Sequence, residues 1–245
     1  MVQNNILIYF LRNKKIYHSP SSLIWYYKYF LFNGIDFTNK SFLDIGGGIG
    51  LASFYALINN SERVVLIEPE DAGSGSFKMD NFYKLEEYFH SYSERITLRK
   101  ELFQDFNELS ENYDIKFLHN SINHLDEDAC ISLTLNDRSR LKYIELFEKL
   151  YTLLKQDGQI IITDCSNRNL FNDIGIKNIL APQIEWQKHK KPETWIELMR
   201  EVGFKEFKIQ WTSLKQFRKL GRILFGNKLI AYLTFSHFKL SARKF

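Results

Sequence analysis

The stretch Phe42-Leu43-Asp44-Ile45-Gly46-Gly47-Gly48-Ile49-Gly50 decides the fold. A short apolar run ends in an acid and continues into four glycines within five positions, and the residues from Leu51 to Leu57 then have the composition of a helix. Strand, glycine turn and helix, in this order, open a βαβ nucleotide-binding unit. Glycine adopts positive φ angles and lets a backbone approach a ligand closely, while the first N–H groups of a helix are free to bind it.

The spacing of the glycines distinguishes two classes of nucleotide-binding loop. The dinucleotide fingerprint G-x-G-x-x-G fails in every register, because its third glycine falls on Leu51 or on Ser53. The pattern D-x-G-x-G-x-G fits from Asp44 to Gly50. In this pattern the sequence resembles the class I S-adenosylmethionine-dependent methyltransferases, whose first motif has the same form.

The resemblance implies a role for each residue of the motif. In that family the glycine turn passes beneath the methionine part of the cofactor, which implies that cofactor binding involves Asp44, Gly46, Gly47, Gly48 and Gly50. The family also has an acid at the end of the second strand, which accepts hydrogen bonds from both ribose hydroxyls. Glu68 closes the apolar run 64–67 at the matching place, and Pro69 follows it. A solvated turn is the alternative reading of the loop alone.

Length and composition bound the fold class. A chain of 245 residues allows one large domain or two small ones, and 44% hydrophobic with 16% aromatic residues suffice for a large core. The unbroken α/β pattern favours a single domain over residues 1–245. The resemblance implies a doubly wound α/β, Rossmann-like methyltransferase fold with a mostly parallel seven-stranded sheet. We expect an N-terminal helical cap at residues 1–39 and a catalytic core at 40–245.

Charge and cysteine content exclude several classes of protein. The net charge of +4 is small and evenly spread, so no nucleic-acid partner is expected. Cys130 and Cys165 fall on different predicted elements and give neither a disulfide framework nor a zinc pattern, which suits a reducing cytosol. No segment approaches the roughly 18 apolar residues of a membrane span. We expect a cytoplasmic protein with a small-molecule substrate and no metal, and its oligomeric state stays open.

Hydrophobic periodicity and turn signals predict the remaining elements. Helices are expected at 79–92, 126–155, 192–203 and 214–225, and a loop at 71–76. Strands are expected at 64–67, 96–98, 114–118 and 159–163, with an antiparallel edge pair at 204–211 and 234–242. The resembled family places an adenine-binding polar residue after the third strand. Gln104 or Asp105 stands there, although the family's Gly-Asp pair is absent.

Two segments are expected to form a mobile cover over the acceptor pocket. Residues 4–33 are rich in aromatics, and residues 168–191 lack periodicity, as binding loops often do. Tyr17 and His18, at the break between two N-terminal helices, are candidate substrate contacts, and so is Glu185 in the second segment. The alternative is that the N-terminal helices only pack on the sheet.

The polar cluster that follows the fourth strand contains the first candidate for a catalytic base. Open α/β sheets bind ligands at the carboxyl ends of their strands, and the run 119–124 lies at such an end. A histidine that titrates near neutrality suits removal of a hydroxyl proton. The resemblance to sugar and small-molecule O-methyltransferases favours His124 as this base, with Asp164 beyond the fifth strand as its acid partner. His189 is the alternative base or a phosphate contact.

The other histidines of the chain have different expected roles. The resemblance implies that His119 and Asn120 hold the methionine portion of the cofactor. His90 and His237 are interpreted as structural or exposed.

The acceptor class follows partly from exclusion. The four prolines are never adjacent, so the [N/D]-P-P-[Y/F] motif of adenine methylation is absent, and the pattern of the RNA cytosine-C5 enzymes is incomplete. The segment 185–203 resembles methyltransferases that modify bacterial surface sugars or capsular phosphoramidate groups, which favours O-methylation of a small polar acceptor. A catalytically silent partner subunit and a nucleotide- or NAD-binding oxidoreductase are the alternatives.

Overall fold

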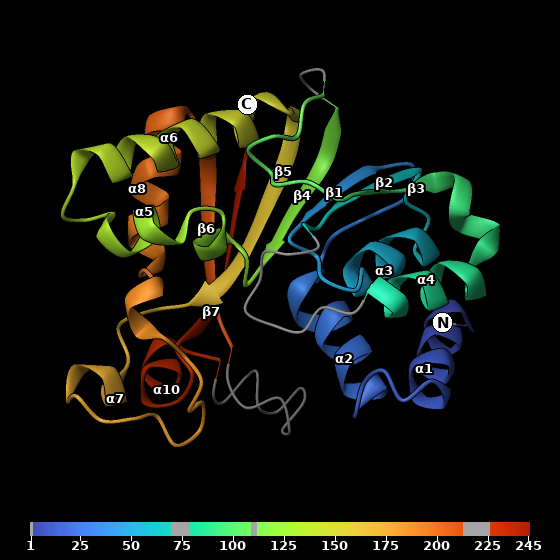
Figure 1. Cartoon of the computed structure of the whole chain (residues 1–245), viewed down its shortest axis with the longest axis horizontal. Coiled ribbons are helices and arrows are strands. Elements are labelled where there is room, and N and C mark those ends of the chain that lie inside the picture. Colours follow the sequence, from blue (N-terminus) through green and yellow to red (C-terminus); the bar gives the residue numbers. More distant parts are fainter. Residues whose placement is uncertain (1, 70–78, 109–111, 213–225) are drawn as a thin grey trace. The chain divides into compact units, whose positions relative to one another are not determined.

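The computed structural model describes residues 2–69, 79–108, 112–212 and 226–245 (Figure 1). Contacts divide the chain into two compact units. The first unit comprises the residues up to 107 together with 113–117, and the second comprises 108–112 together with 118–245. The predicted loop at 71–76 and the predicted basic helix at 214–225 lie outside the described residues. A single domain over residues 1–245, with a cap at 1–39, stays a prediction.

The strands form a seven-stranded sheet in the order β3-β2-β1-β4-β5-β7-β6. Their bounds are β1 Ser41–Ile45, β2 Arg63–Ile67, β3 Ile96–Arg99, β4 Tyr113–His119, β5 Leu154–Cys165, β6 Lys205–Trp211 and β7 His237–Arg243. β1 pairs with β2, and β2 with β3, in parallel, whereas β7 runs antiparallel to both β5 and β6. The sheet is therefore mixed. The predicted antiparallel pair at its edge is confirmed.

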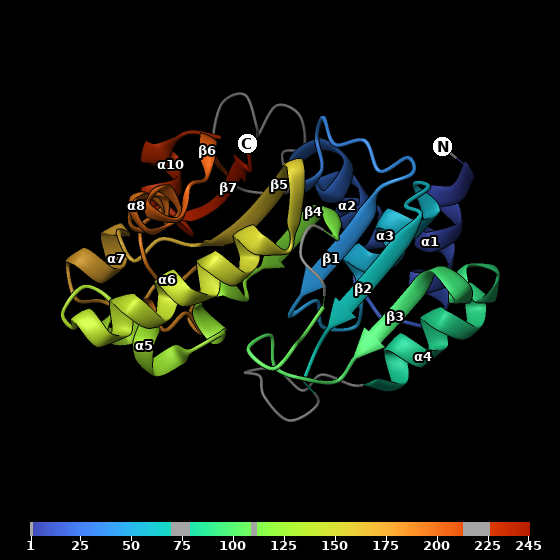
Figure 2. The ribbon, with the colours of Figure 1, turned by 90° about the horizontal axis from the view of Figure 1, so that it is seen from above.

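In the first unit, helices pack tightly on the parallel strands (Figure 2). They are α1 Val2–Asn13, α2 Pro20–Tyr26, the π-helix η1 Tyr27–Leu31, α3 Leu51–Ile58, α4 Met79–Tyr88 and the 3₁₀ helix η2 His90–Arg95. α3 contacts β1 and β2 on one side and α1 on the other. Because α3 is enclosed in this way, all eight of its residues are buried, as expected of a helix that is apolar on every face.

The N-terminal helices contribute aromatic side chains to this packing. Phe10 of α1 lies 4.5 Å, between ring centroids, from Tyr88 of α4. Tyr27 of η1 packs edge-on against Tyr55 of α3, and Phe32 stacks on the same ring. These segments are therefore part of the core of the first unit, which agrees with the alternative reading that they pack on the sheet layer. Their role as a cap stays a prediction.

In the second unit, helices α6 and α8 pack against each other. The helices of this unit are η3 Ile122–His124, α5 Glu127–Ser132, α6 Asp137–Thr152, α7 Leu170–Asp173, η4 Trp186–Lys188, α8 Pro192–Val202 and α10 Lys228–Leu233. Trp195 of α8 is fully buried against Tyr143 and Phe147 of α6. Gly203 ends α8 in the left-handed conformation at φ 114°.

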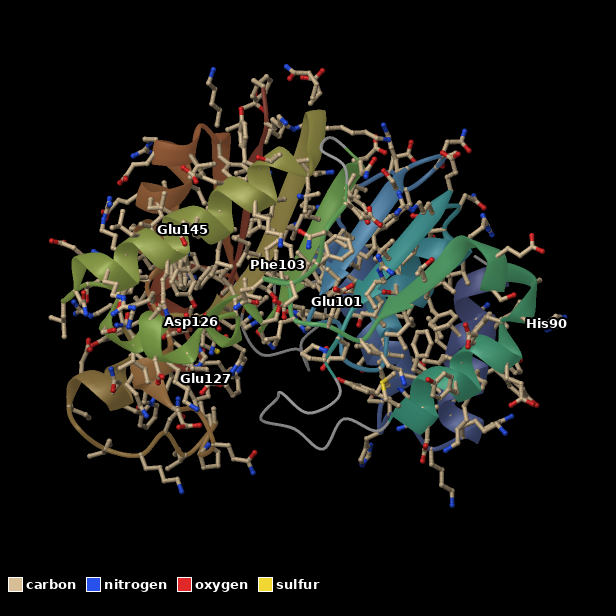
Figure 3. The ribbon with its side chains drawn as sticks, turned by 45° about the horizontal axis from the view of Figure 1, so that its top comes forward. His90, Glu101, Phe103, Asp126, Glu127 and Glu145 are labelled. Atoms are coloured by element: carbon tan, nitrogen blue, oxygen red, sulfur yellow. The ribbon has the colours of Figure 1, made fainter. Side chains whose placement is uncertain are left out.

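The single helical region predicted at 126–155 is wrong, because two caps divide it. The Asp126 carboxylate accepts a hydrogen bond from the Ala129 N–H and starts α5, and the Asn136 side chain accepts one from Arg138 N–H and starts α6. Figure 3 shows Asp126 and Glu127 at the start of α5, and Glu145 on α6. The helix then ends at Thr152, since β5 begins as early as Leu154.

The irregular segment 168–191 is held by two buried asparagines. The Asn169 amide donates hydrogen bonds to the carbonyls of Tyr232 and Thr234 and to the Ser236 hydroxyl, at 2.9–3.1 Å. Asn178 donates a further bond to the Thr234 carbonyl at 2.7 Å. Side-chain amides thus replace the regular backbone pairing that the sequence pattern does not provide here. This part of the segment is a fixed scaffold.

Replacing Asn169 by alanine should destabilise the protein markedly. The change leaves buried acceptors without their donor, and each such group costs roughly 1–3 kcal/mol. We expect Asn169→Ala to lower the free energy of unfolding by about 2–4 kcal/mol in urea titrations. Asn172→Ala is the matched control, because Asn172 is exposed and donates to a single carbonyl. Equal losses in the two variants would contradict the scaffold role of Asn169.

Candidate functional site

The glycine loop between β1 and α3 has the backbone shape that its sequence predicts. Gly46, Gly48 and Gly50 have φ angles of 67°, 59° and 77°, a region that other residues rarely adopt. The Gly46 N–H donates to the Ile67 carbonyl at 2.8 Å, and the Gly50 N–H donates to the Gly47 carbonyl at 3.0 Å. The Phe54 N–H of α3 donates to the Gly50 carbonyl at 2.9 Å, so the loop is tied to the end of β2 and to the first turn of α3.

Gly47 is required for a different reason, which is space. A Cβ atom at this position would lie 2.4 Å from Cγ of Asp44 and 2.5 Å from Cδ1 of Leu66. Contacts this short do not occur, so any side chain would push the loop away from the strands. The loop backbone thus lies directly against the carboxylate of Asp44.

Asp44 is a fully buried acid at the end of β1. Its Oδ2 accepts a hydrogen bond from the Ser53 hydroxyl at 2.7 Å, and its Oδ1 has no partner among the described residues. Burial, opposed by the hydrogen bond from Ser53 and reinforced by the negative charge of Glu68, raises the pKa of Asp44 to about 7. Among the described residues, this carboxyl therefore lacks a positive partner.

Glu68 fastens the loop from the opposite side. Its Oε2 accepts a hydrogen bond from the Gly48 N–H at 2.9 Å, and the residue is 8% exposed. Burial raises the pKa of Glu68, and the Gly48 N–H partly opposes that rise. Pro69, which follows, is half-buried. Loop, Asp44 and Glu68 thus come together as the motif predicted.

Two residues near Asp44 were not predicted. Ser53, in the first turn of α3, supplies the hydrogen bond described above, and Tyr27 lies within electrostatic reach. Burial raises the pKa of Tyr27, and the negative charge of Asp44 raises it further. Tyr17 is 38% exposed. His18 is exposed.

The structure gives less support to the predicted adenine contacts after β3 than to the predicted site at the glycine loop, Asp44 and Glu68. Gln104 and Asp105 are both exposed, in the turn that contains Glu101 and Phe103 (Figure 3). Phe103, in contrast, is buried. A role of Gln104 in cofactor binding stays a prediction.

The second unit contains an acid–histidine pair that differs from the one expected. The Asp164 carboxylate accepts a hydrogen bond from Nδ1 of His189 at 2.8 Å, and the side chains are 1% and 14% exposed. The same Oδ1 accepts the Cys165 N–H, while Oδ2 has no partner among the described residues. The expected partnership of Asp164 with His124 is therefore wrong. The ring of His189, which comes from the irregular segment, occupies that position.

His124 has its own acidic partner. Its Nδ1 lies 2.5 Å from Oε1 of Glu127, which starts α5 three residues later. Lys188 bridges Glu127, at 2.9 Å, and Glu185, at 3.1 Å. These four side chains form a continuous polar row, and Glu185, a predicted substrate contact, is its exposed end.

Polar residues at the end of β4 form a third group. His119 Nδ1 is hydrogen-bonded to the Thr163 hydroxyl. Asn120, at φ 53°, donates its N–H to the Thr163 carbonyl, and its side-chain oxygen pairs with Nε2 of His237 at 3.1 Å. His237 in turn bonds Thr212 through Nδ1. His237 was expected to be structural or exposed, and it holds the side chain of Asn120.

The described residues contain no group of three or more His, Cys, Asp or Glu side chains that could hold a metal ion. None of their helices combines the length and the apolar character that crossing a bilayer requires.

Comparisons with known proteins identify the fold. No protein-family model and no curated protein matches the sequence. Among solved structures, a SAM dependent methyltransferase from Archaeoglobus fulgidus is 17% identical with a TM-score of 0.56, over 96% of this chain and 99% of that one. The 1,6-didemethyltoxoflavin-N1-methyltransferase of Burkholderia thailandensis, with bound S-adenosylhomocysteine, is 15% identical with a TM-score of 0.53, over 92% and 76%. The cyclase SpnF is 12% identical with a TM-score of 0.55, over 91% and 79%.

At these identities the comparisons establish the fold, which is Rossmann-like and shared with S-adenosylmethionine-dependent methyltransferases. The presence of a cyclase among the similar structures means that the reaction has to be argued from the residues of this chain.

The raised pKa of Asp44 predicts a specific pH dependence of stability. Its folded pKa of about 7 lies above its ordinary value of 3.8, so the folded state holds the proton more tightly than the unfolded state does. The resulting stabilisation is complete below pH 3.8 and is lost as the pH rises toward 7. Relative to Asp44→Asn, the wild-type protein should lose up to roughly 4 kcal/mol of unfolding free energy across this range. Urea titrations from pH 4.5 to 8 measure the difference.

The matched control is Asp128→Asn, which replaces an exposed carboxylate on α5. Its stability curve should run parallel to that of the wild type. If the stability of Asp44→Asn also depended on pH as that of the wild type does, Asp44 would titrate as an ordinary carboxyl.

Proposed function

We propose that this protein is an S-adenosylmethionine-dependent methyltransferase that acts on a small polar acceptor. The observation that carries the proposal is the buried Asp44, whose Oδ1 has no partner among the described residues, directly beneath a loop with three left-handed glycines. A buried acid without a positive partner is costly unless a ligand supplies the missing charge.

The residues of the first unit suit this cofactor. Its methionine part carries a positive charge, which complements the carboxylate of Asp44 and would lower the raised pKa of that group. A carboxylate has about four acceptor positions, so Glu68 can serve ribose hydroxyls in addition to the Gly48 N–H. Gly46, Gly47 and Gly50 leave backbone rather than side chains facing the ligand. Pro69, Gln104, His119 and Asn120 are proposed as further cofactor contacts.

The cofactor, when bound, supplies an activated methyl group, so the chain itself has to bind the acceptor and remove its proton. Asp164 and His189 are suited to the second task. A carboxylate only accepts hydrogen bonds, so Nδ1 of His189 carries the hydrogen in this pair and Nε2 is left as the basic nitrogen. Asp164 also stabilises the imidazolium that forms when Nε2 takes a proton from an acceptor hydroxyl.

His124 offers the same arrangement in a more exposed setting. Glu127 orients its ring through Nδ1, while Nε2 lies 3.5 Å from the Asn123 amide. Solvent screening weakens the influence of an exposed carboxylate, and Glu127 also pairs with Lys188. We therefore propose His189 as the principal base, with His124 as the second candidate. Tyr17, His18 and Glu185 are proposed contacts of the acceptor.

The finer proposal is O-methylation of a sugar, a sugar phosphate or a capsule-type phosphoramidate group. It is supported by the two acid–histidine pairs, since each orients an imidazole as a base for a hydroxyl. An ionised phosphoramidate oxygen would need no base, and the same histidines would then act as hydrogen-bond donors.

Glu68→Ala should weaken cofactor binding by at least about tenfold. The change removes two charge-assisted hydrogen bonds to the ribose, each worth roughly 1.5–3 kcal/mol. Calorimetric titration with S-adenosylmethionine and with S-adenosylhomocysteine measures the affinity. Glu62→Ala, which removes an exposed acid just before β2, is the control and should bind normally. Wild-type affinity in a folded Glu68→Ala protein would refute the assignment of the cofactor site.

The two histidines can be distinguished by turnover. A screen of sugars, sugar phosphates and nucleotide sugars with labelled S-adenosylmethionine first identifies an acceptor. His189→Ala should then lower kcat by about 10²–10⁴-fold, the usual contribution of a general base, and leave cofactor affinity near the wild-type value. His124→Ala should have the smaller effect. A larger loss of kcat in His124→Ala than in His189→Ala would make His124 the base. Full turnover in both variants would exclude proton removal by either histidine.

Asp164→Asn tests whether the pair acts as a unit. Asp164→Asn should lower kcat, as His189→Ala does, but by a smaller factor. In the His189→Ala background it should change little, because groups that act together are not additive. Additive losses would mean that Asp164 acts independently of His189.

A further inference from the structure

The second unit contains a cavity of about 620 Å³ whose lining is unusually cationic. Its charged and aromatic lining residues are Arg168, Lys191, Lys228, Glu193, Trp211 and Tyr232. Cavities of this size accommodate small molecules. Among the described residues of the lining, three cations and one acid give a formal charge of +2, which favours an anionic ligand.

The three cations differ in how far they are already neutralised. Arg168 pairs with Asp173 at 3.0 Å, and Lys228 pairs with Glu193 at 2.9 Å. Lys191, which precedes α8, forms no salt bridge with a described carboxylate, although its charge helps to lower the pKa of Glu193. Lys191 is therefore the cation of this cavity that is most available to an incoming anion.

An aromatic wall accompanies the cations. Trp211 lies at the end of β6, where its ring packs on Phe238 at 5.9 Å between centroids. The Lys228 ammonium lies 5.8 Å from the centroid of the same indole. Flat aromatic faces bind the apolar faces of rings, and the adjacent cations bind charged substituents. The cavity thus suits a ring that carries an anionic group.

Two lining residues connect this cavity to the acid–histidine pair along the chain. Ser166 follows Asp164 by two residues, and Lys191 follows His189 by two residues. A span of two residues covers at most about 7 Å. A ligand in the cavity is therefore within a small molecule's length of the backbone that carries the proposed base.

We propose that this cavity binds the phosphate monoester of a ring-bearing small molecule, such as a sugar phosphate, and that this compound is the methyl acceptor. The claim that this compound is the methyl acceptor rests on the proposed function. A phosphate monoester carries about −1.5 to −2 charges at neutral pH, opposite in sign to the net charge of the described lining residues. Trp211 receives the ring, and Lys191 and Arg168 hold the phosphate.

Binding can be tested without any methyl transfer. Calorimetric or NMR titration with glucose 1-phosphate, glucose and inorganic phosphate is done in the absence of cofactor, in a buffer without competing phosphate. Glucose 1-phosphate should bind more tightly than glucose by at least about tenfold, the equivalent of one charge-assisted hydrogen bond. Inorganic phosphate should compete with it. Equal binding of glucose and glucose 1-phosphate, or no binding of either, would overturn the proposal.

Matched variants locate the site. Lys191→Gln should weaken glucose 1-phosphate binding by about five- to tenfold, and Lys191→Arg should retain it. Lys177→Gln makes the same charge change at an exposed lysine that does not line the cavity and should leave affinity unchanged. Lys228→Gln serves as a second test if Lys191→Gln does not fold. Equal effects at positions 191 and 177 would overturn the assignment.

A lipid phosphate is the other source of the same chemistry, since Ile174, Ile176 and Ile179 are exposed on the neighbouring segment. Co-sedimentation with phosphatidylcholine vesicles that contain phosphatidic acid distinguishes the two sources. We expect none. Co-sedimentation that Lys191→Gln abolishes would assign the cavity to a membrane lipid and overturn the soluble ligand. These measurements need no cofactor. They therefore test ligand binding in the cavity even if the protein does not transfer methyl groups.

Discussion

One buried carboxylate, that of Asp44, constrains the arrangement of the first unit. It lies where charge is unfavourable, and among the described residues its only hydrogen bond comes from Ser53. α3 has to begin where it does for Ser53 to reach the acid. The loop has to have glycine at position 47, because a Cβ atom there would overlap the carboxylate. Glu68 then anchors the N–H of Gly48, so strand, loop and helix are all fixed around a group whose Oδ1 has no partner among the described residues.

The parts of this arrangement that sequence predicts are those in which the determining residues lie close together. The spacing of Asp44 and the glycines is local, and an alternation of apolar runs and helices is enough to place Glu68 at the end of the next strand. The antiparallel strand pair is also a periodic pattern, which the structure confirms. Ser53 could have been found from its position in the first turn of α3, directly behind the loop.

The parts that sequence did not predict depend on contacts between distant residues. Asp164 could equally have received His124 or His189, and only the path of the irregular segment brings the ring of His189 to it. That path is set by Asn169 and Asn178, whose amides bond to carbonyls more than fifty residues away. A buried asparagine and an exposed one look the same in a sequence. The break between α5 and α6 was missed for the opposite reason, because hydrophobic periodicity continued across a local cap at Asn136.

The fold alone does not specify the reaction, since a cyclase shares it with methyltransferases. The stronger indication comes from two buried carboxylates, Asp44 and Asp164, each of which has one oxygen without a partner among the described residues. Buried polar atoms are nearly always satisfied in stable proteins, because leaving one unpaired costs roughly 1–3 kcal/mol. Unsatisfied carboxylates at the ends of two strands of one sheet are therefore expensive for a protein that only needs to fold. They are explained if each acid acts on a charge that appears in function: the positive cofactor at Asp44, and the imidazolium of His189 at Asp164.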